Sequence, residues 1–192
     1  MIEWMNRKQK TPLKKVVYMA WSGCPSEDEM NYILRDCHCS SQILIYSDAP
    51  PNFRFSNNIR RIDCLDVSYS EWVTIDNLLT MDGIDIVLES SSLSNRDLNV
   101  FLRHWLSGGC PRLKLFSAET GYLDYVQVLD GLLHNAVLVE NRRDYTSPFG
   151  YSRTLSFGVD IRRADGVSAT VCGQADGTLV IGVWPETTYN YN

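Results

Sequence analysis

The chain has 192 residues, 44% of them hydrophobic and 21% charged, which is an ordinary balance for a globular domain that buries its own core. Acidic residues outnumber basic ones by 23 to 18, and the net charge of −5 argues against a nucleic-acid-binding protein that neutralises phosphates. The six cysteines follow no compact framework, so we expect reduced thiols and no disulfide or metal staple.

Residues 1–12 form a basic leader that we expect to be disordered, with five Lys or Arg in the first fifteen positions against Glu3 alone. Such a segment could touch a membrane or a nucleic acid, but a solvated leader is the simpler interpretation. The apolar run 16–21 is too short for a signal-peptide core or a membrane span. The chain is therefore expected to be intracellular, in the cytoplasm or the nucleus, with no membrane partner.

Strands and helices alternate along residues 26–118. Helices are predicted over 26–37, 72–83 and 94–107, and strands over 42–47, 59–67, 84–90 and 112–118. Connections of this length favour parallel strands, because parallel neighbours need crossover segments. The distances between successive strands overlap those of leucine-rich repeats. The predicted fold class is therefore α/β, a degenerate leucine-rich-repeat-like strand–helix array.

Capping residues mark the helix starts. Ser26 and Glu29 have the spacing of a capping box, and Thr74 is the expected cap of the second helix. Gly83 is predicted to end that helix in the left-handed conformation.

The stretch LSNRDLNVFLRHW, 93–105, contains residue types found in active sites, but its pattern indicates a helix that packs against a core. Ser94 and Asp97 suit a helix start, and Gly108 or Gly109 ends the helix. One apolar stripe follows helical spacing through Leu98, Phe101, Leu102, Trp105 and Leu106. Cys110 lies about one and two-thirds turns after His104 and is not expected to act with it as a nucleophile.

The C-terminal third changes character. A last helix is predicted over 124–133, a strand over 136–140 and a polar loop over 141–152. Three alternating segments follow, 153–163, 167–172 and 178–184, separated by Asp-Gly turns at 165–166 and 176–177. They predict a C-terminal antiparallel β-meander that covers an edge of the array. Leu155, Phe157, Val159 and Ile161 should share one face, and the tail 185–192 should be loosely ordered.

The sequence lacks the common signatures of catalysis and cofactor binding. Cys37, His38 and Cys39 have ligand side chains but no second pair to complete a zinc site. Glycine-rich phosphate loops and a nucleophile elbow are absent from the sequence. We therefore expect no catalytic residue, no metal and no cofactor. A small hydrolase or transferase with an unrecognised Cys or Asp site stays as the alternative.

Four segments resemble the F-box-associated domain, type 2, which follows the F-box in a large family of F-box proteins. They are WVTIDNLLTMD (72–82), SSLSNRDLNVFLRHWLSGGCPRLKLF (91–116), VDIRRADGVSATV (159–171) and VIGVW (180–184). The resemblance implies one domain over 13–184, best supported over 59–184. The family's recurring residues, here Leu98, Asn99, Phe101, Leu102, Trp105, Asp160, Arg162 and Gly166, fit a structural signature.

The resemblance also implies a function without catalysis. Such a domain is a protein–protein interaction module that recognises the substrate of an SCF-type ubiquitin ligase. Residues 1–12 lack the Leu-Pro opening of an F-box, so the Skp adaptor is expected as a partner only if an F-box is supplied elsewhere. A truncated family copy without a partner is a further alternative.

A contact surface can be predicted from strand parity. If strands 84–90 and 112–118 are neighbours, Asp85 lies beside Lys114 and Val87 beside Phe116. These four residues would then form a partner-binding face opposite the helices. The alternative is that the C-terminal strands cover this face.

Overall fold

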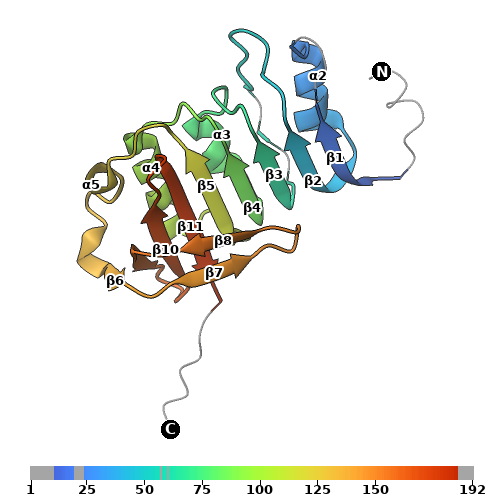
Figure 1. Ribbon diagram of the computed structural model, residues 1–192. Helices are drawn as coiled ribbons and strands as arrows, with labels where there is room; N and C mark the ends of the chain where they lie inside the picture. Colours follow the sequence, from blue (N-terminus) through green and yellow to red (C-terminus); the bar gives the residue numbers. More distant parts are fainter. Residues whose placement is uncertain (1–10, 20–23, 57, 60, 186–192) are drawn as a thin grey trace.

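A mixed β-sheet runs through the whole molecule. In this computed structural model, which describes residues 11–19, 24–56, 58–59 and 61–185, the sheet has nine strands in the order β1-β2-β3-β4-β5-β11-β10-β9-β6. The chain up to Glu119 supplies β1 (Leu13–Tyr18), β2 (Cys39–Ile45), β3 (Cys64–Val67), β4 (Asp85–Leu88) and β5 (Leu115–Glu119). These five strands are parallel and follow the order of the chain (Figure 1), as predicted for β2 to β5, whereas β1 was not predicted. The leader up to residue 10 and the tail from 186 lie outside the described residues.

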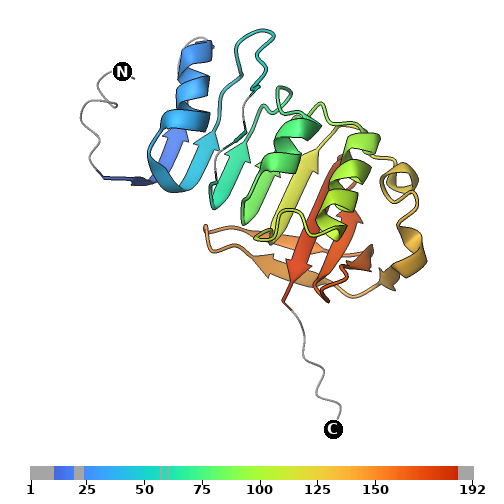
Figure 2. The same cartoon turned by 180° about the vertical axis from the view of Figure 1, so that it is seen from behind.

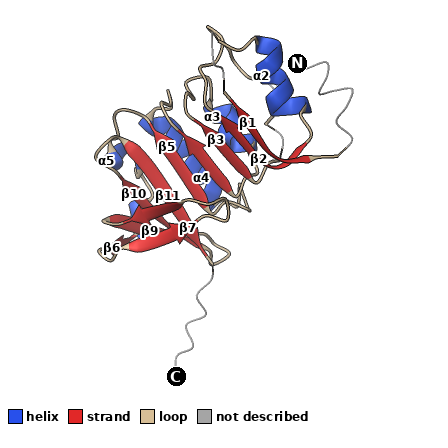
Figure 3. Ribbon diagram, turned by 45° about the vertical axis from the view of Figure 1, so that its right-hand side comes forward, coloured by secondary structure: helices blue, strands red, loops and turns tan. Residues whose placement is uncertain are grey.

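The connections between parallel strands place the longer helices on one face of the sheet, as Figures 2 and 3 show. Helix α2 (Glu27–Asn31) continues as a π-helical turn (Tyr32–Asp36), and α3 (Ile75–Thr80) and α4 (Asn95–Leu106) follow. All three begin at the expected caps, each a capping box. The segment from β2 to β3 contains no helix among its described residues. The connections are thus unequal, and the leucine-rich-repeat-like arrangement is not confirmed.

Helix α4 packs as its apolar stripe predicts. Leu98, Phe101, Leu102 and Trp105 are buried, and the Phe101 ring lies 4.4 Å from that of Phe116 on β5, centroid to centroid. A positive φ of 98° at Gly108 follows the last turn, a conformation that glycine adopts without a Cβ clash.

The C-terminal strands form the predicted antiparallel meander. Strand β11 (Thr178–Trp184) pairs with β5, and β10 (Ser168–Gly173), β9 (Gly158–Arg162) and β6 (Val137–Val139) follow. Both Asp-Gly turns hold their glycine at positive φ, as hairpin loops of this kind require. The meander therefore covers the edge that β5 would otherwise expose.

Four predictions for local structure are wrong. Helix α3 ends at Thr80, and Gly83 does not have a positive φ. The predicted helix 124–133 consists of α5 (Tyr125–Val128) and a 3-10 turn (Leu133–Asn135). The predicted loop 141–152 contains β7 (Arg143–Thr146), which pairs with β8 (Ser152–Leu155) in a second sheet. The predicted strand 153–163 is divided between the two sheets, because the chain bends at 156–157.

The hairpin β7–β8 lies in front of the sheet, on the side away from the helices (Figure 1). The hydrophobic core therefore consists of two clusters. The larger part lies between sheet and helices, and a smaller cluster beneath the hairpin contains Val87, Leu115, Tyr145, Leu155, Cys172 and Val180. None of the helices in the described part of the chain has the length and apolar character needed to cross a membrane.

Candidate interaction surface

The four residues predicted to form a partner-binding face do not lie together on the surface. Asp85 pairs with Leu115, and Phe116 pairs with Ile86, so the predicted register between the two strands is wrong by one residue. Asp85, Val87 and Phe116 are buried, and Lys114 is half-buried. Phe116 points to the helices, while the hairpin covers the other face, as the alternative stated. A partner-binding role for these residues stays a prediction.

The register could not be read from the sequence because β5 is buried on both of its faces. Residues 115–118 are all buried, so no alternation of polar and apolar residues marks one side. The strand also begins irregularly, since the backbone N–H groups of Lys114 and Leu115 both donate to the Ile84 carbonyl.

Asp85 anchors the hairpin to the sheet. Its carboxylate is fully buried and accepts three hydrogen bonds from hydroxyl groups of the hairpin. The Tyr145 hydroxyl donates at 2.6 Å, the Ser147 hydroxyl at 2.5 Å and the Tyr151 hydroxyl at 2.8 Å. We call these four residues the Asp85 latch. Burial, and then the hydrogen bond to Asp85, raise the pKa of both tyrosines, which keeps their hydroxyls protonated as donors.

Two cysteines of the core, Cys64 and Cys110, are poor nucleophiles. Burial, with the nearby Asp85 carboxylate, raises the pKa of Cys64 to about 12. Burial, with Asp82, raises the pKa of Cys110 to about 11, and the Cys110 thiol donates to the Met81 carbonyl at 3.4 Å. Both thiols therefore stay protonated near neutral pH. Over the residues with described positions, no three His, Cys, Asp or Glu side chains are grouped to hold a metal ion.

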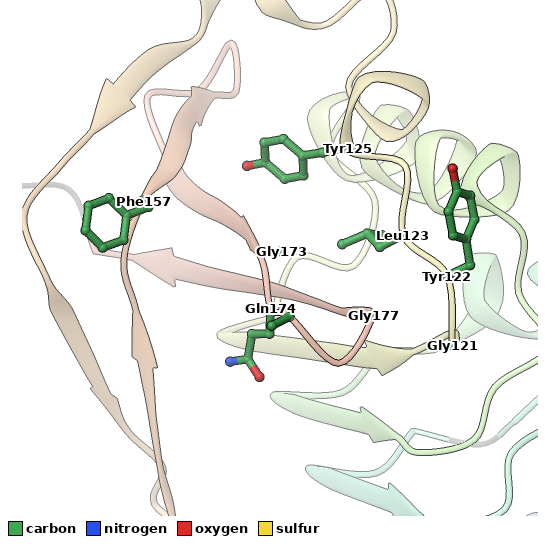
Figure 4. A pocket seen from close by; sticks show the side chains of 9 residues that line it. Gly121, Tyr122, Leu123, Tyr125, Phe157, Gly173, Gln174 and Gly177 are labelled. Atoms are coloured by element: carbon green, nitrogen blue, oxygen red, sulfur yellow. The ribbon is translucent and has the colours of Figure 1, made fainter.

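An open groove of about 380 Å³ lies where α5 meets the β10–β11 turn. We call it the aromatic groove. Its lining consists of Gly121, Tyr122, Leu123, Tyr125, Phe157, Gly173, Gln174, Ala175 and Gly177. Figure 4 shows Phe157 and Tyr122 toward opposite ends, with Tyr125 and Leu123 between them. Three aromatic side chains thus gather around one concave surface.

The base of the groove is held by backbone contacts. The backbone N–H and the hydroxyl of Thr120 both donate to the Gly177 carbonyl, at 3.2 and 3.1 Å. A Cβ at Gly177 would lie 2.9 Å from the carbonyl carbon of Gly121, and one at Gly173 would lie 2.7 Å from the Leu123 side chain. Glycine is therefore needed where the turn and the 120–123 segment approach each other.

Phe157 is the most unusual residue of the groove. Its φ of 55° is rare for a bulky residue, and 83% of its surface is exposed. Such a backbone costs about 1–3 kcal/mol, and exposing an aromatic ring adds nothing to the core. The neighbouring Gly158 has no room for a side chain, because a Cβ there would lie 2.4 Å from the Val171 carbonyl oxygen. The bend at 156–158 thus holds the Phe157 ring outside the core.

Sequence reasoning missed this surface. The alternation of 153–163 predicted that Phe157 shares a buried face with Val159, which is buried, whereas Phe157 is exposed. The available signal was Gly158, since a glycine within an alternating run marks a bulge or bend.

Comparison with known proteins gives a family match in the middle of the chain. Residues 54–118, which contain β3, β4 and all of β5 except Glu119, match the family model described as F-box associated. The chain is also 30% identical over 124 residues to the Skn-1 dependent zygotic transcript 15 protein of Caenorhabditis elegans. That alignment covers 63% of this chain and 34% of the relative, so it spans about a third of that protein. No solved structure matches the chain significantly.

Proposed function

We propose, from the premise that residues 54–118 belong to the F-box associated family, that the chain is a non-catalytic protein-interaction module that docks a partner protein on the aromatic groove. The observation that carries the proposal is Phe157, an exposed aromatic ring on a backbone conformation that aromatic residues rarely adopt. Aromatic side chains are the commonest anchors of protein interfaces, and backbone strain is concentrated at functional sites.

The groove lies outside the segment that matches the family model. The matched segment 54–118 supplies the central parallel strands β3 to β5 and the helices α3 and α4, while the groove is built by residues 121–177. A shared scaffold with a separate contact surface lets related chains bind different partners, because loops and turns change more freely than the core.

The finer proposal is that the partner is a substrate of an SCF-type ubiquitin ligase, in the cytoplasm or the nucleus. The domain extends over 13–184, and the Skp adaptor binds only through an F-box supplied elsewhere. The family match supports the interaction role, and the substrate is identified by experiment.

Site-specific photo-crosslinking tests the proposal. A benzophenone amino acid replaces Phe157 in one version of the chain and Leu138 in the other, because these side chains are 83% and 81% exposed and Leu138 does not line the groove. We expect a discrete crosslinked protein from position 157 alone. Identical products from both positions, or none from 157, would refute docking on the groove. Co-precipitation of a crosslinked protein with ubiquitin-ligase subunits then tests the ligase role.

A further inference from the structure

We infer that the aromatic groove takes an uncharged, proline-rich extended segment of the partner protein. This inference rests on the proposed function, since it names the chemistry of the segment that docks there. It follows from the charge of the groove, the state of its polar groups and the arrangement of its aromatic rings.

The uncharged lining of the aromatic groove disfavours a partner segment that carries charged side chains. The residues that line the groove include no charged side chain among those described, although 21% of the chain is charged. A charged side chain of the partner would meet no charged residue in the lining, and the two neighbouring carboxylates, Asp124 and Asp176, already accept backbone N–H groups of their own turns. The groove therefore suits a neutral segment.

The hydrogen-bonding groups favour a segment with few backbone N–H groups. The carbonyls of Gln174 and Gly177 already accept from Gly177 and Thr120, and the Val171 carbonyl accepts from the Tyr125 hydroxyl. These three carbonyls are not free acceptors for an ordinary peptide, whose N–H groups would have to reach the Gln174 amide oxygen or the Tyr122 hydroxyl. Proline has no N–H to satisfy.

The groove still offers donors for the carbonyls of a bound segment. The Gln174 side chain is exposed, and so is Tyr122, whose side chain is 72% exposed. A polyproline II chain presents its carbonyls outward, with no internal hydrogen bonds. Donors beside aromatic rings match such a chain, as in other aromatic-lined grooves that bind it.

The shape of the groove agrees with this occupant. About 380 Å³ lies toward the lower end of the range of ligand pockets, about 300–1,000 Å³, and suits a few residues of an extended chain. An open groove cannot enclose a flexible chain, so the occupant must lose little entropy on binding. A proline-rich segment is already extended before it binds.

Titration of the full chain with a labelled peptide of about twelve residues, built on the repeat Ala-Pro-Pro-Leu, tests the inference by nuclear magnetic resonance. We expect shifts of the backbone amides of Gly121, Gly173 and Gly177. Two matched peptides separate the arguments, one with alanine for every proline and one with aspartate for every leucine. Both should bind about tenfold more weakly.

Phe157→Ser should weaken binding of the proline-rich peptide by about tenfold or more, whereas the matched surface change Leu138→Ser should leave it unchanged. Undisturbed spectra of the free variants show that each remains folded. No binding at millimolar peptide, equal binding of the alanine peptide, or an equal loss in both variants would overturn the inference. If crosslinking from position 157 still captures a partner, the proposed function stands and only the proline-rich chemistry fails.

Discussion

Replacing Asp85 by alanine should free the β7–β8 hairpin from the sheet. The change removes a buried carboxylate that accepts hydrogen bonds from Tyr145, Ser147 and Tyr151 at 2.5–2.8 Å. Hydrogen bonds to a charged group contribute about 1.5–3 kcal/mol each, but the three do not simply add, since the hydroxyls regain water when the hairpin lifts. Removing one partner of a buried charged group typically costs about 3–5 kcal/mol, and we expect a loss of unfolding free energy of that size.

Urea unfolding followed by tryptophan fluorescence measures this loss, and limited trypsin digestion reports on the hairpin itself through Arg143 and Arg153. Asp130→Ala is the matched control, because it removes an exposed carboxylate and should change the unfolding free energy by less than about 0.5 kcal/mol. Tyr145→Phe should cost about 1.5–3 kcal/mol, since it removes one donor. A loss below about 1 kcal/mol for Asp85→Ala, with unchanged digestion, would show that the Asp85 latch does not hold the hairpin.

Three further predictions follow from the core. Phe116→Asp should unfold the domain, with a cost above about 4 kcal/mol, because it places an unpaired charge in the main core; a native circular dichroism spectrum would contradict this. Because burial raises the pKa of Cys64 from 9.0 to about 12, the folded chain keeps a proton that the unfolded chain loses, so stability should be intact below pH 9 and fall from about pH 9 towards 12. Cys64→Ala should flatten that fall in urea unfolding at several pH values. Gly158→Ala should lower the melting temperature, at a cost of about 1–3 kcal/mol, because its Cβ would meet the Val171 carbonyl oxygen; an unchanged value would argue against the close approach.

The local elements were largely predictable because their signals are short-range. The three capping boxes depend on side chains three residues apart, and the stripe of α4 on helical spacing. The Asp-Gly turns likewise indicate the C-terminal hairpins. The family resemblance, drawn from continuous segments, agrees with the match over 54–118.

The candidate site was not predictable from such signals. The partner-binding face proposed from parity depended on a register that β5, buried on both sides, does not reveal. The strand β7 was missed because its alternation is weak, and because Asp85, to which its Tyr145 donates, lies 60 residues away in the chain.

The sequence by itself determined the helix caps, the buried stripe of α4, the Asp-Gly turns and the resemblance to the F-box associated family over 54–118, since each depends on residues close together in the chain. Only the tertiary structure decided what covers the face of the sheet opposite the helices. The buried Asp85 carboxylate accepts hydrogen bonds from three hydroxyls about sixty residues away in the chain, and these bonds hold the β7–β8 hairpin over that face. The bend beyond that hairpin leaves Phe157 exposed beside α5 and the β10–β11 turn, and Gly158 then lets the backbone pass close to the Val171 carbonyl of β10.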